Sequence, residues 1–268
     1  MKKTFLALCS IAILLYACKD EDIIINNESK STQATEDHIF AEKTFSDIVR
    51  VIEEGFLASG VTKSCPSYNL TTSNIFDIDM LIVNFGTINC LHNNKLRRGK
   101  IFITYTAKYR DSLAVMTANF ENFYVNNNLV EGEIIITNEG RNKSGNMCFT
   151  ILVNNASIVT ENGKINWSSN RKKEWISGTS TYLDITDDKY KITGFSSGIA
   201  VNNNSFSVEI TDTLNIDLSC LPSCVIKSGH SKISPNGYDD RIINYGDSLC
   251  DCNFDIMING EKHLIVVN

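Results

Sequence analysis

Residues 99–109 read GKIFITYTAKY, and their side chains alternate with a period of two. Ile101, Ile103 and Tyr105 fall on one side of this alternation, and Thr104 falls on the other. Successive side chains of a β-strand point to opposite faces of a sheet, so the stretch predicts a strand of about 35 Å. It therefore indicates a fold built mainly from β-strands.

Similar runs follow along the rest of the chain, at residues 113–125, 129–137, 148–160, 164–168, 179–185, 190–195, 206–212 and 255–267. Turn signals separate them, such as three asparagines at 126–128 and the Asn-Gly pairs at 162–163 and 259–260. Asn-Gly suits two-residue hairpin turns, because both central positions need a positive φ. Consecutive hairpins predict a mainly β fold, a long antiparallel meander arranged as a sandwich or a half-barrel.

Residues 35–60 have a helical period instead. Thr35 is placed to cap a helix and Gly60 to end it. Apolar residues recur at helical spacing on one face, namely Phe45, Ile48, Val49, Ile52 and Phe56. We expect one N-terminal amphipathic helix over 35–60, packed against an antiparallel β domain over 61–268.

The composition is that of an ordinary globular protein, with 43% apolar and 21% charged residues. A net charge of −6 argues against nucleic acid as a partner. The four histidines stand in no metal or triad motif: His38, His92, His230 and His263. We therefore predict no catalysis and no cofactor.

Residues 1–17 have the features of a secretory signal peptide. Lys2 and Lys3 precede an apolar run over 5–16 that is too short to span a membrane. Cys18 follows Leu-Tyr-Ala, which resembles a bacterial lipobox. The resemblance implies that Cys18 carries acyl chains such as palmitate and becomes the mature N-terminus; ordinary cleavage and release is the alternative.

Residues 18–34 are predicted to form a polar tether behind this anchor. The tether opens with Lys19-Asp20-Glu21-Asp22, which resembles the export tag of surface lipoproteins in anaerobic gut Gram-negative bacteria. By that resemblance, the protein is an outer membrane lipoprotein exposed at the cell surface. A solvated acidic linker is the alternative.

Seven of the nine cysteines remain outside the signal peptide and the anchor. They are Cys65, Cys90, Cys148, Cys220, Cys224, Cys250 and Cys252. An exported chain can form disulfides, and an odd number leaves at least one thiol without a partner in the chain. We predict the pairs Cys65–Cys90, Cys224–Cys250 and Cys220–Cys252, with Cys148 free. A four-thiolate zinc site at the last four cysteines in the sequence is the alternative.

Several motifs in the second half of the chain are similar to a widespread family of surface lipoproteins from gut anaerobes. They are GEIIITN at 132–138, YKITG at 190–194, YGDSLCD at 245–251 and ING at 258–260. The resemblance covers roughly residues 65–267 and implies fold and location, but no activity. The chain departs from the family pattern at Ser248, where a glycine is expected, and at Cys252.

Two tryptophans are candidates for glycan binding. Trp167 and Trp175 flank what looks like a basic turn at 171–173, and exposed tryptophans there could stack on sugar rings. The alternative is that both belong to the core.

Acidic residues could hold calcium in loops, although simple solvation is the alternative. They are Asp184, Asp187, Asp188, Asp239 and Asp240.

Three triplets of aspartate, hydroxyl residue and leucine resemble the acceptor sequence for O-glycosylation in the same kind of bacteria. The resemblance implies sugar on Ser112, Thr213 or Ser248. Ser112 and Thr213 are the stronger candidates, because Ser248 is close to Cys250. Three unmodified strand ends are the alternative.

These features together predict a surface-anchored lipoprotein that acts as a structural, adhesion or interaction module. Its partners would be the outer membrane, through the N-terminal lipid, and a glycan or another envelope protein. The first alternative is a glycan-binding accessory protein. The second is a carrier that holds an apolar ligand in a half-open sheet.

Overall fold

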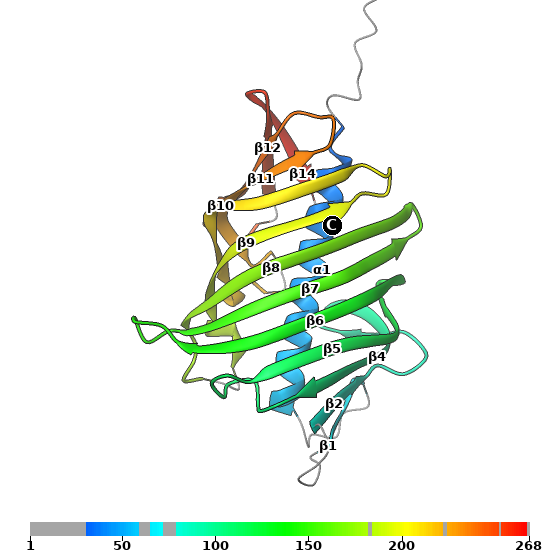
Figure 1. The fold of residues 1–268 in the computed structure, drawn as a ribbon, viewed down its shortest axis with the longest axis vertical. Coiled ribbons are helices and arrows are strands. Elements are labelled where there is room, and N and C mark those ends of the chain that lie inside the picture. The colour runs from blue at the N-terminus through cyan, green and yellow to red at the C-terminus, as the bar shows by residue number, and fades with distance from the viewer. Residues whose placement is uncertain are drawn as a thin grey trace, which may run out of the picture.

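The structure is a computed structural model that describes residues 31–58, 65–71, 79–181, 184–221, 224–251 and 253–266. It contains one α-helix, α1 (Gln33–Ala58), and a single open sheet of fourteen strands (Figure 1). The predicted mainly β class, the antiparallel arrangement and the single N-terminal helix are confirmed. The signal peptide, Cys18 and most of the tether lie outside the described residues.

The strands follow one another in chain order across the sheet, each antiparallel to its neighbour, except that β3 pairs only with β4. Their bounds are β1 (Ser67–Thr71), β2 (Asp79–Asn84), β3 (Cys90–His92), β4 (Lys95–Tyr105), β5 (Val115–Val125), β6 (Asn128–Arg141), β7 (Met147–Thr160), β8 (Gly163–Ser177), β9 (Lys189–Ile199), β10 (Ser205–Asp217), β11 (Ile226–Pro235), β12 (Arg241–Asp247), β13 (Asn253–Ile258) and β14 (Glu261–Val266). Two short 3₁₀ helices, η2 (Ile185–Asp187) and η3 (Leu218–Cys220), lie in the connections.

Two sequence-based assignments are wrong. The strand predicted at 179–185 is a connection, because Thr181 N–H bonds back to the Gly178 carbonyl and Asp184 caps η2. The basic turn predicted at 171–173 is the middle of β8, which runs unbroken through it. Strands β1, β2, β3, β11 and β12 were not predicted at all.

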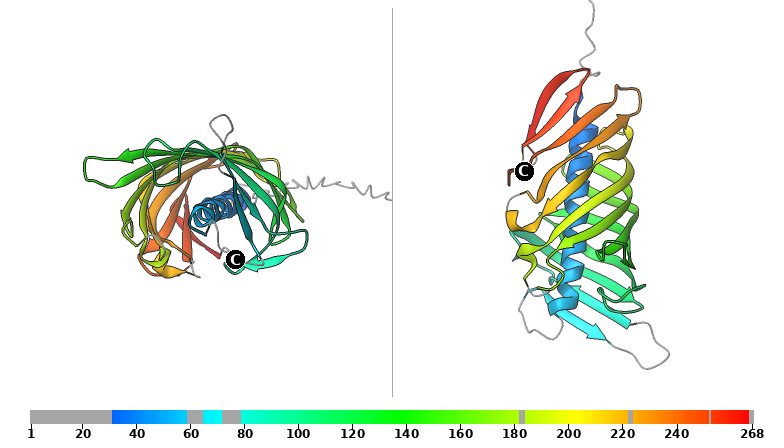
Figure 2. Two further views of the ribbon diagram at one scale, coloured as in Figure 1. Left: turned by 90° about the horizontal axis from the view of Figure 1, so that it is seen from below. Right: turned by 90° about the vertical axis from the view of Figure 1, so that its left-hand side faces the viewer.

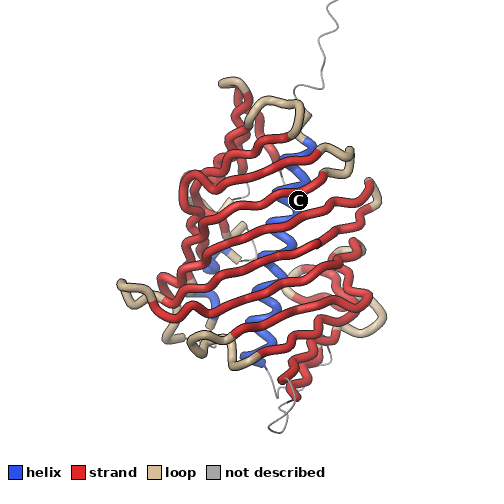
Figure 3. The backbone as a smooth tube through the Cα atoms, in the orientation of Figure 1, coloured by secondary structure: helices blue, strands red, loops and turns tan. Residues whose placement is uncertain are grey.

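The sheet curves around α1, which lies along its concave side (Figure 2). The strands run across the direction of the helix, so that successive helical turns face successive strands (Figure 3). Register shifts occur within several of the long pairs, including β5 with β6, β7 with β8 and β9 with β10. Such bulges bend a strand and increase its local twist, which accounts for the curvature.

The helix begins one turn earlier than its predicted cap. The Thr32 carbonyl accepts hydrogen bonds from the N–H groups of Thr35 and Glu36, and the Thr32 hydroxyl bonds to the Glu36 carboxylate. Thr35 is inside the helix and fully buried. The helix ends at Ala58, and Gly60 lies outside the described residues.

Burial of α1 extends far beyond its predicted apolar face. Phe45, Ile48 and Ile52 are buried as expected, but so are most of the residues on the other sides of the helix. Gly55 allows α1 to approach β2 closely, because a Cβ there would lie 2.9 Å from a methyl carbon of Leu81. An α-helix crossing a concave sheet in this way has little surface left for solvent.

Three carboxylates of α1 are buried against cations of the sheet. Asp47 pairs with Arg97 of β4, Glu42 pairs with Arg171 of β8, and Glu53 lies 3.3 Å from Lys173 of the same strand. All six side chains are less than a tenth exposed. Buried charges of this kind are tolerated only when they are paired, so the pairs fix which face of the helix meets which strand.

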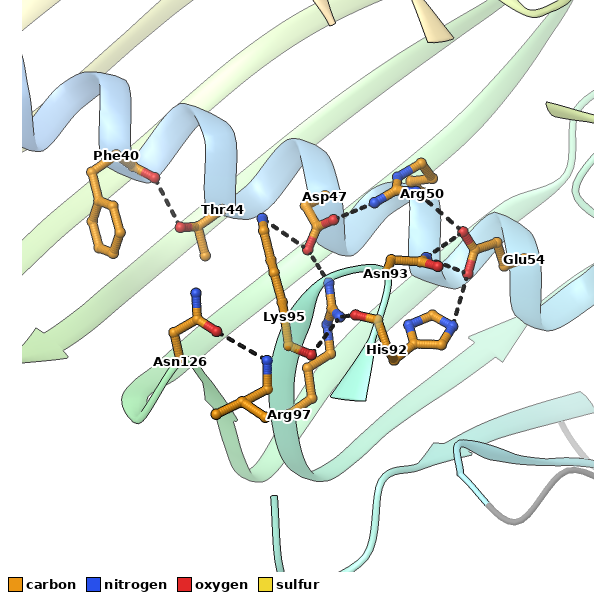
Figure 4. A network of polar contacts seen from close by, with 11 residues as sticks. Phe40, Thr44, Asp47, Arg50, Glu54, His92, Asn93, Lys95, Arg97 and Asn126 are labelled. Atoms are coloured by element: carbon orange, nitrogen blue, oxygen red, sulfur yellow. Dashed lines mark hydrogen bonds and ion pairs between the residues drawn. The ribbon is translucent and has the colours of Figure 1, made fainter. Parts of the chain in front are cut away.

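The Asp47 pair belongs to a larger network at the turn between β3 and β4 (Figure 4). The Asp47 carboxylate lies 2.6 Å from Arg50 and 3.2 Å from Lys95, in addition to Arg97. Burial opposes ionisation, but Lys95, Arg97 and Arg50 together hold the pKa of Asp47 below its ordinary value. The same turn contacts the helix again through His92, whose ring lies 3.3 Å from Glu54.

His38 is buried near the other end of the helix. Its Nδ1 accepts a hydrogen bond of 3.4 Å from the Trp167 indole, and its ring packs edge-on against Phe206. The Nε2 atom has no hydrogen-bond partner. Burial lowers the pKa of His38 to about 4, with Glu42 raising it and Arg171 lowering it by smaller amounts. The ring is therefore neutral at pH 7.

Replacing one partner of a buried ion pair should lower the free energy of unfolding far more than replacing both partners by apolar residues. Arg171→Met leaves Glu42 buried without its cation, and we expect a loss of about 3–5 kcal/mol in the free energy of unfolding. The double variant Glu42→Leu/Arg171→Met should lose much less, because no charge is left unpaired. The exposed pair Lys100–Glu121, at 2.8 Å, provides the control: Lys100→Met should cost less than about 1 kcal/mol. Urea unfolding of the four proteins measures this. Equal losses in the single and double Glu42/Arg171 variants would contradict it.

His38 should make the fold sensitive to acid. Its pKa is about 4 in the folded chain and about 6.5 when unfolded, so the unfolded chain binds more protons between these values. Stability is therefore lost as the pH falls from 6.5 towards 4, by about 3 kcal/mol from this group. His38→Gln keeps an acceptor for Trp167 and should remove this part of the loss. Parallel stability curves for the two proteins between pH 7 and 4 would rule out the role of His38.

Candidate functional site

The concave side of the sheet is filled by α1 and the core, which leaves the convex face as the broad accessible surface. Strand alternation sends every second residue outward to that face. The two tryptophans predicted to bind glycans point the other way. Trp167 is 3% exposed and stacks on Phe45, and Trp175 is 0% exposed, so the core interpretation is confirmed and neither ring can meet a sugar.

A groove of about 590 Å³ lies on the convex side of β9, β10 and β11. Phe195 lines it and is 59% exposed, which is unusual for a ring of this size. The remaining lining residues are Gly194, Ser196, Ser197, Ser207, Val208, Glu209, Ile210, Lys232 and Ser234. No motif in the sequence indicated this site.

A bulge in β10 lies beside the groove. Glu209 pairs with Phe195 and Leu214 pairs with Ile192, so four residues of β10 lie opposite two residues of β9. The extra residues bend β10 beside Phe195. Bulges commonly re-aim side chains near functional sites, and here Ile210, the first residue of the bulge, lines the groove.

Four serines form a row across the convex face. Ser168 of β8 pairs with Ser197 of β9, which pairs with Ser207 of β10, which pairs with Ser234 of β11. Neighbours on each of these strands face the core, since Trp167, Ser196, Phe206 and Ile233 are all buried. The hydroxyls of the row therefore share the outer face.

A second row of outward-facing residues runs parallel to the serines, two residues away from them on each strand. It consists of Asn170, Phe195, Glu209 and Lys232. Lys232 is neutralised by Asp240 at 3.3 Å, and Ser234 bonds to the same carboxylate, which lowers the pKa of Asp240. The Glu209 carboxylate makes no hydrogen bond or ion pair within the described part of the chain. The groove thus presents a ring, several hydroxyls and one unpaired carboxylate.

No family model, curated protein or solved structure matches this chain. Among the described residues, no helix has the length and hydropathy needed to span a bilayer. The site must therefore be interpreted from its own geometry.

A polar cluster around Lys173 is the other concentration of titratable groups. The Lys173 ammonium lies 3.3 Å from Tyr109 Oη and 3.8 Å from the centre of the Tyr190 ring, in addition to Glu53. Asp188 accepts hydrogen bonds from Trp175 and Tyr190, and burial raises its pKa to about 6. All these side chains are buried, so the cluster serves to pack α1 against the sheet.

The remaining histidines pair with single carboxylates. His230 lies 2.8 Å from Asp212 on the neighbouring strand, and neither lines the groove. No group of three or more histidine, cysteine or acidic residues within the described ranges could hold a metal ion.

The acidic turns predicted as calcium ligands use their oxygens for local hydrogen bonds. Asp184 accepts from Thr186, Asp187 accepts from Thr181, and Asp188 is buried as described above. Asp239 accepts from the Asn259 amide, and Asp240 is taken by Lys232 and Ser234.

The cysteines form disulfides, but not all in the predicted pairs. Cys65–Cys90 is confirmed, and Cys148 is free. Cys220 pairs with Cys250 instead of Cys252, because η3 turns the end of β10 towards the segment after β12 and brings the two Cα atoms within 5.2 Å. Cys224 is also in a disulfide, whereas Cys252 lies outside the described residues. A four-thiolate zinc site is therefore wrong.

The predicted glycosylation residues fall in two kinds of place. Ser112 and Ser248 are exposed in connections, and each precedes an exposed leucine. Thr213 is half-buried within the β10 bulge, and Leu214 after it is buried. The position of Thr213 is therefore not a loop tip, and Ser112 and Ser248 are the more accessible hydroxyls.

Peptide mapping without reductant should recover the 65–90 and 220–250 cross-linked peptides. Cys148 should react with an alkylating reagent without reduction, slowly at pH 7 because burial and Glu174 raise the pKa of its thiol. A cross-linked peptide joining Cys224 to Cys250 would contradict the structure.

Proposed function

We propose that this protein is a surface-anchored outer membrane lipoprotein that acts as an interaction module through the convex face of its sheet. Exported proteins form disulfides where cytosolic ones rarely do, so the pairs Cys65–Cys90 and Cys220–Cys250 support an extracytoplasmic location. The Cys18 anchor and the acidic residues after it are expectations from sequence. No catalysis is expected.

The observation that carries the proposal is the contrast between the two faces of the sheet. In this proposal the sheet is a half-barrel whose interior is already occupied by α1, with fully buried residues such as Ile48 and Ile52. That occupation argues against the carrier of an apolar ligand. The exposed Phe195 and the groove around it leave the convex face as the surface for a partner.

The second candidate function, a glycan-binding accessory protein, now depends on different residues. The buried Trp167 and Trp175 no longer support it. The exposed ring of Phe195 and the neighbouring serine hydroxyls favour it, because sugar sites combine an aromatic platform with hydrogen-bonding groups.

The tether sets how far this face can stand from the membrane. Ser31 lies against β12, because its carbonyl accepts a hydrogen bond of 2.8 Å from Arg241. The stretch from Cys18 to Ser31 reaches at most roughly 45 Å when fully extended. The β12 end of the domain would therefore lie nearest the anchor.

Cys18→Ala should abolish lipidation and surface display in the native host. Asp20→Ala/Glu21→Ala should keep the lipid but hold the protein on the periplasmic side. Asn26→Ala/Asn27→Ala, in the same tether, is the matched control and should be displayed normally. Antibody staining and protease treatment of whole cells measure display. Normal staining of the Asp20/Glu21 variant would overturn the export-tag interpretation, and normal staining of Cys18→Ala would overturn the anchor.

A further inference from the structure

We infer that the convex groove binds an uncharged oligosaccharide whose chain runs across β8, β9, β10 and β11. The inference rests on the proposed function, since it takes the convex face as the interaction surface and names the class of its ligand. Two parallel rows of side chains carry it: the four serines, and Asn170, Phe195, Glu209 and Lys232.

The serine row provides hydroxyls at a fixed repeat. Neighbouring strands lie about 4.8 Å apart, so the row from Ser168 to Ser234 spans roughly 14 Å. That repeat is close to the length of one pyranose residue in an extended chain. A serine hydroxyl can donate one hydrogen bond and accept two, and sugar hydroxyls do the same. The Ser234 hydroxyl already bonds to Asp240, so it offers only acceptor positions. Ser197 and Ser207 at the centre of the row are exposed.

Phe195 supplies the apolar platform next to this row. Phe195 lies two residues from Ser197 on the same face of β9. An exposed aromatic ring can stack on the apolar face of a sugar while neighbouring polar groups bond to its hydroxyls. Ile199, 40% exposed on the same face, extends the platform along the strand.

The charges of the groove select against acidic glycans. Lys232 is neutralised by Asp240, whereas the Glu209 carboxylate has no partner in the described ranges. Glu209 would repel an anionic sugar, but it can accept hydrogen bonds from neutral sugar hydroxyls. An extended peptide pairing with the sheet backbone does not fit here, because β8, β9, β10 and β11 are each paired with a strand on both sides.

Binding can be measured by calorimetry on the full-length chain in a detergent that has no sugar headgroup. The probes are maltohexaose, cellohexaose and mannohexaose, with hexagalacturonate as the charged counterpart. We expect at least one neutral hexasaccharide to bind and hexagalacturonate to bind at least tenfold more weakly. Phe195→Ala should lower the affinity at least tenfold, and Ser197→Ala/Ser207→Ala several-fold.

Matched controls lie on the same face but away from the groove. Ile176→Ala, at a 39% exposed position of β8, and Ser177→Ala should bind like the parent protein. All five replaced side chains are exposed, so the thermal midpoint should change little in each variant.

The inference would be overturned by no binding of any neutral hexasaccharide, by unchanged affinity in Phe195→Ala, or by tighter binding of hexagalacturonate. Capture of a protein ligand that depends on Phe195, without sugar binding, would also overturn it. Whole-cell staining separates this inference from the proposed function. If the protein is displayed normally but binds no sugar, only the oligosaccharide inference is wrong. If it binds sugar but does not reach the cell surface, the proposed surface role is wrong.

Discussion

The pairing of α1 carboxylates with cations on the concave side of the sheet is the constraint on which the structure depends. A helix buried on nearly every side would normally be apolar all round, yet α1 carries Glu42, Asp47 and Glu53 into the interior. Each ionised carboxylate would be costly there unless a cation lay opposite. Arg171, Arg97 and Lys173 provide those cations from strands on two sides of the helix. The carboxylates therefore meet their cations at only one rotation of the helix about its axis and one position along that axis.

This pairing also determines which side chains of the sheet face the core and which face solvent. Arg171 points inward to Glu42, so its neighbour Asn170 must point outward; Ser196 bonds to Arg171, so Ser197 faces solvent. A slip of one residue in any strand would exchange these roles and bury the wrong set. The inward contacts thus set the register, and the register sets which side chains reach the convex face.

Local pattern was enough to predict β4 to β10 and the last hairpin, but not β1, β2, β3, β11 or β12, nor what each strand packs against. The alternation at 99–109 corresponds to β4 with its end shifted by four residues, and the hairpin at 259–260 joins β13 to β14 as expected. The basic triplet at 171–173 was misinterpreted, because consecutive cations usually lie in solvent. Its partner Glu42 is 129 residues away, and no local signal links them. Cys220 was misassigned for a similar reason, since a 3₁₀ turn after β10 decides which cysteine it meets.

The candidate site could not be predicted from the sequence, because its residues come from four strands and are brought together only by strand pairing. Ser168, Ser197, Ser207 and Ser234 stand in unrelated local contexts, and only the pairing of β8 to β11 lines them up. That pairing is held from the inner face, where Trp167 and Phe206 pack around His38 of the helix. Side chains held by a sheet whose other face is fully packed lose little freedom on binding a ligand. The charges that seat α1 therefore also help to fix the positions of the outer row of serines, the row that we propose binds a repeating partner.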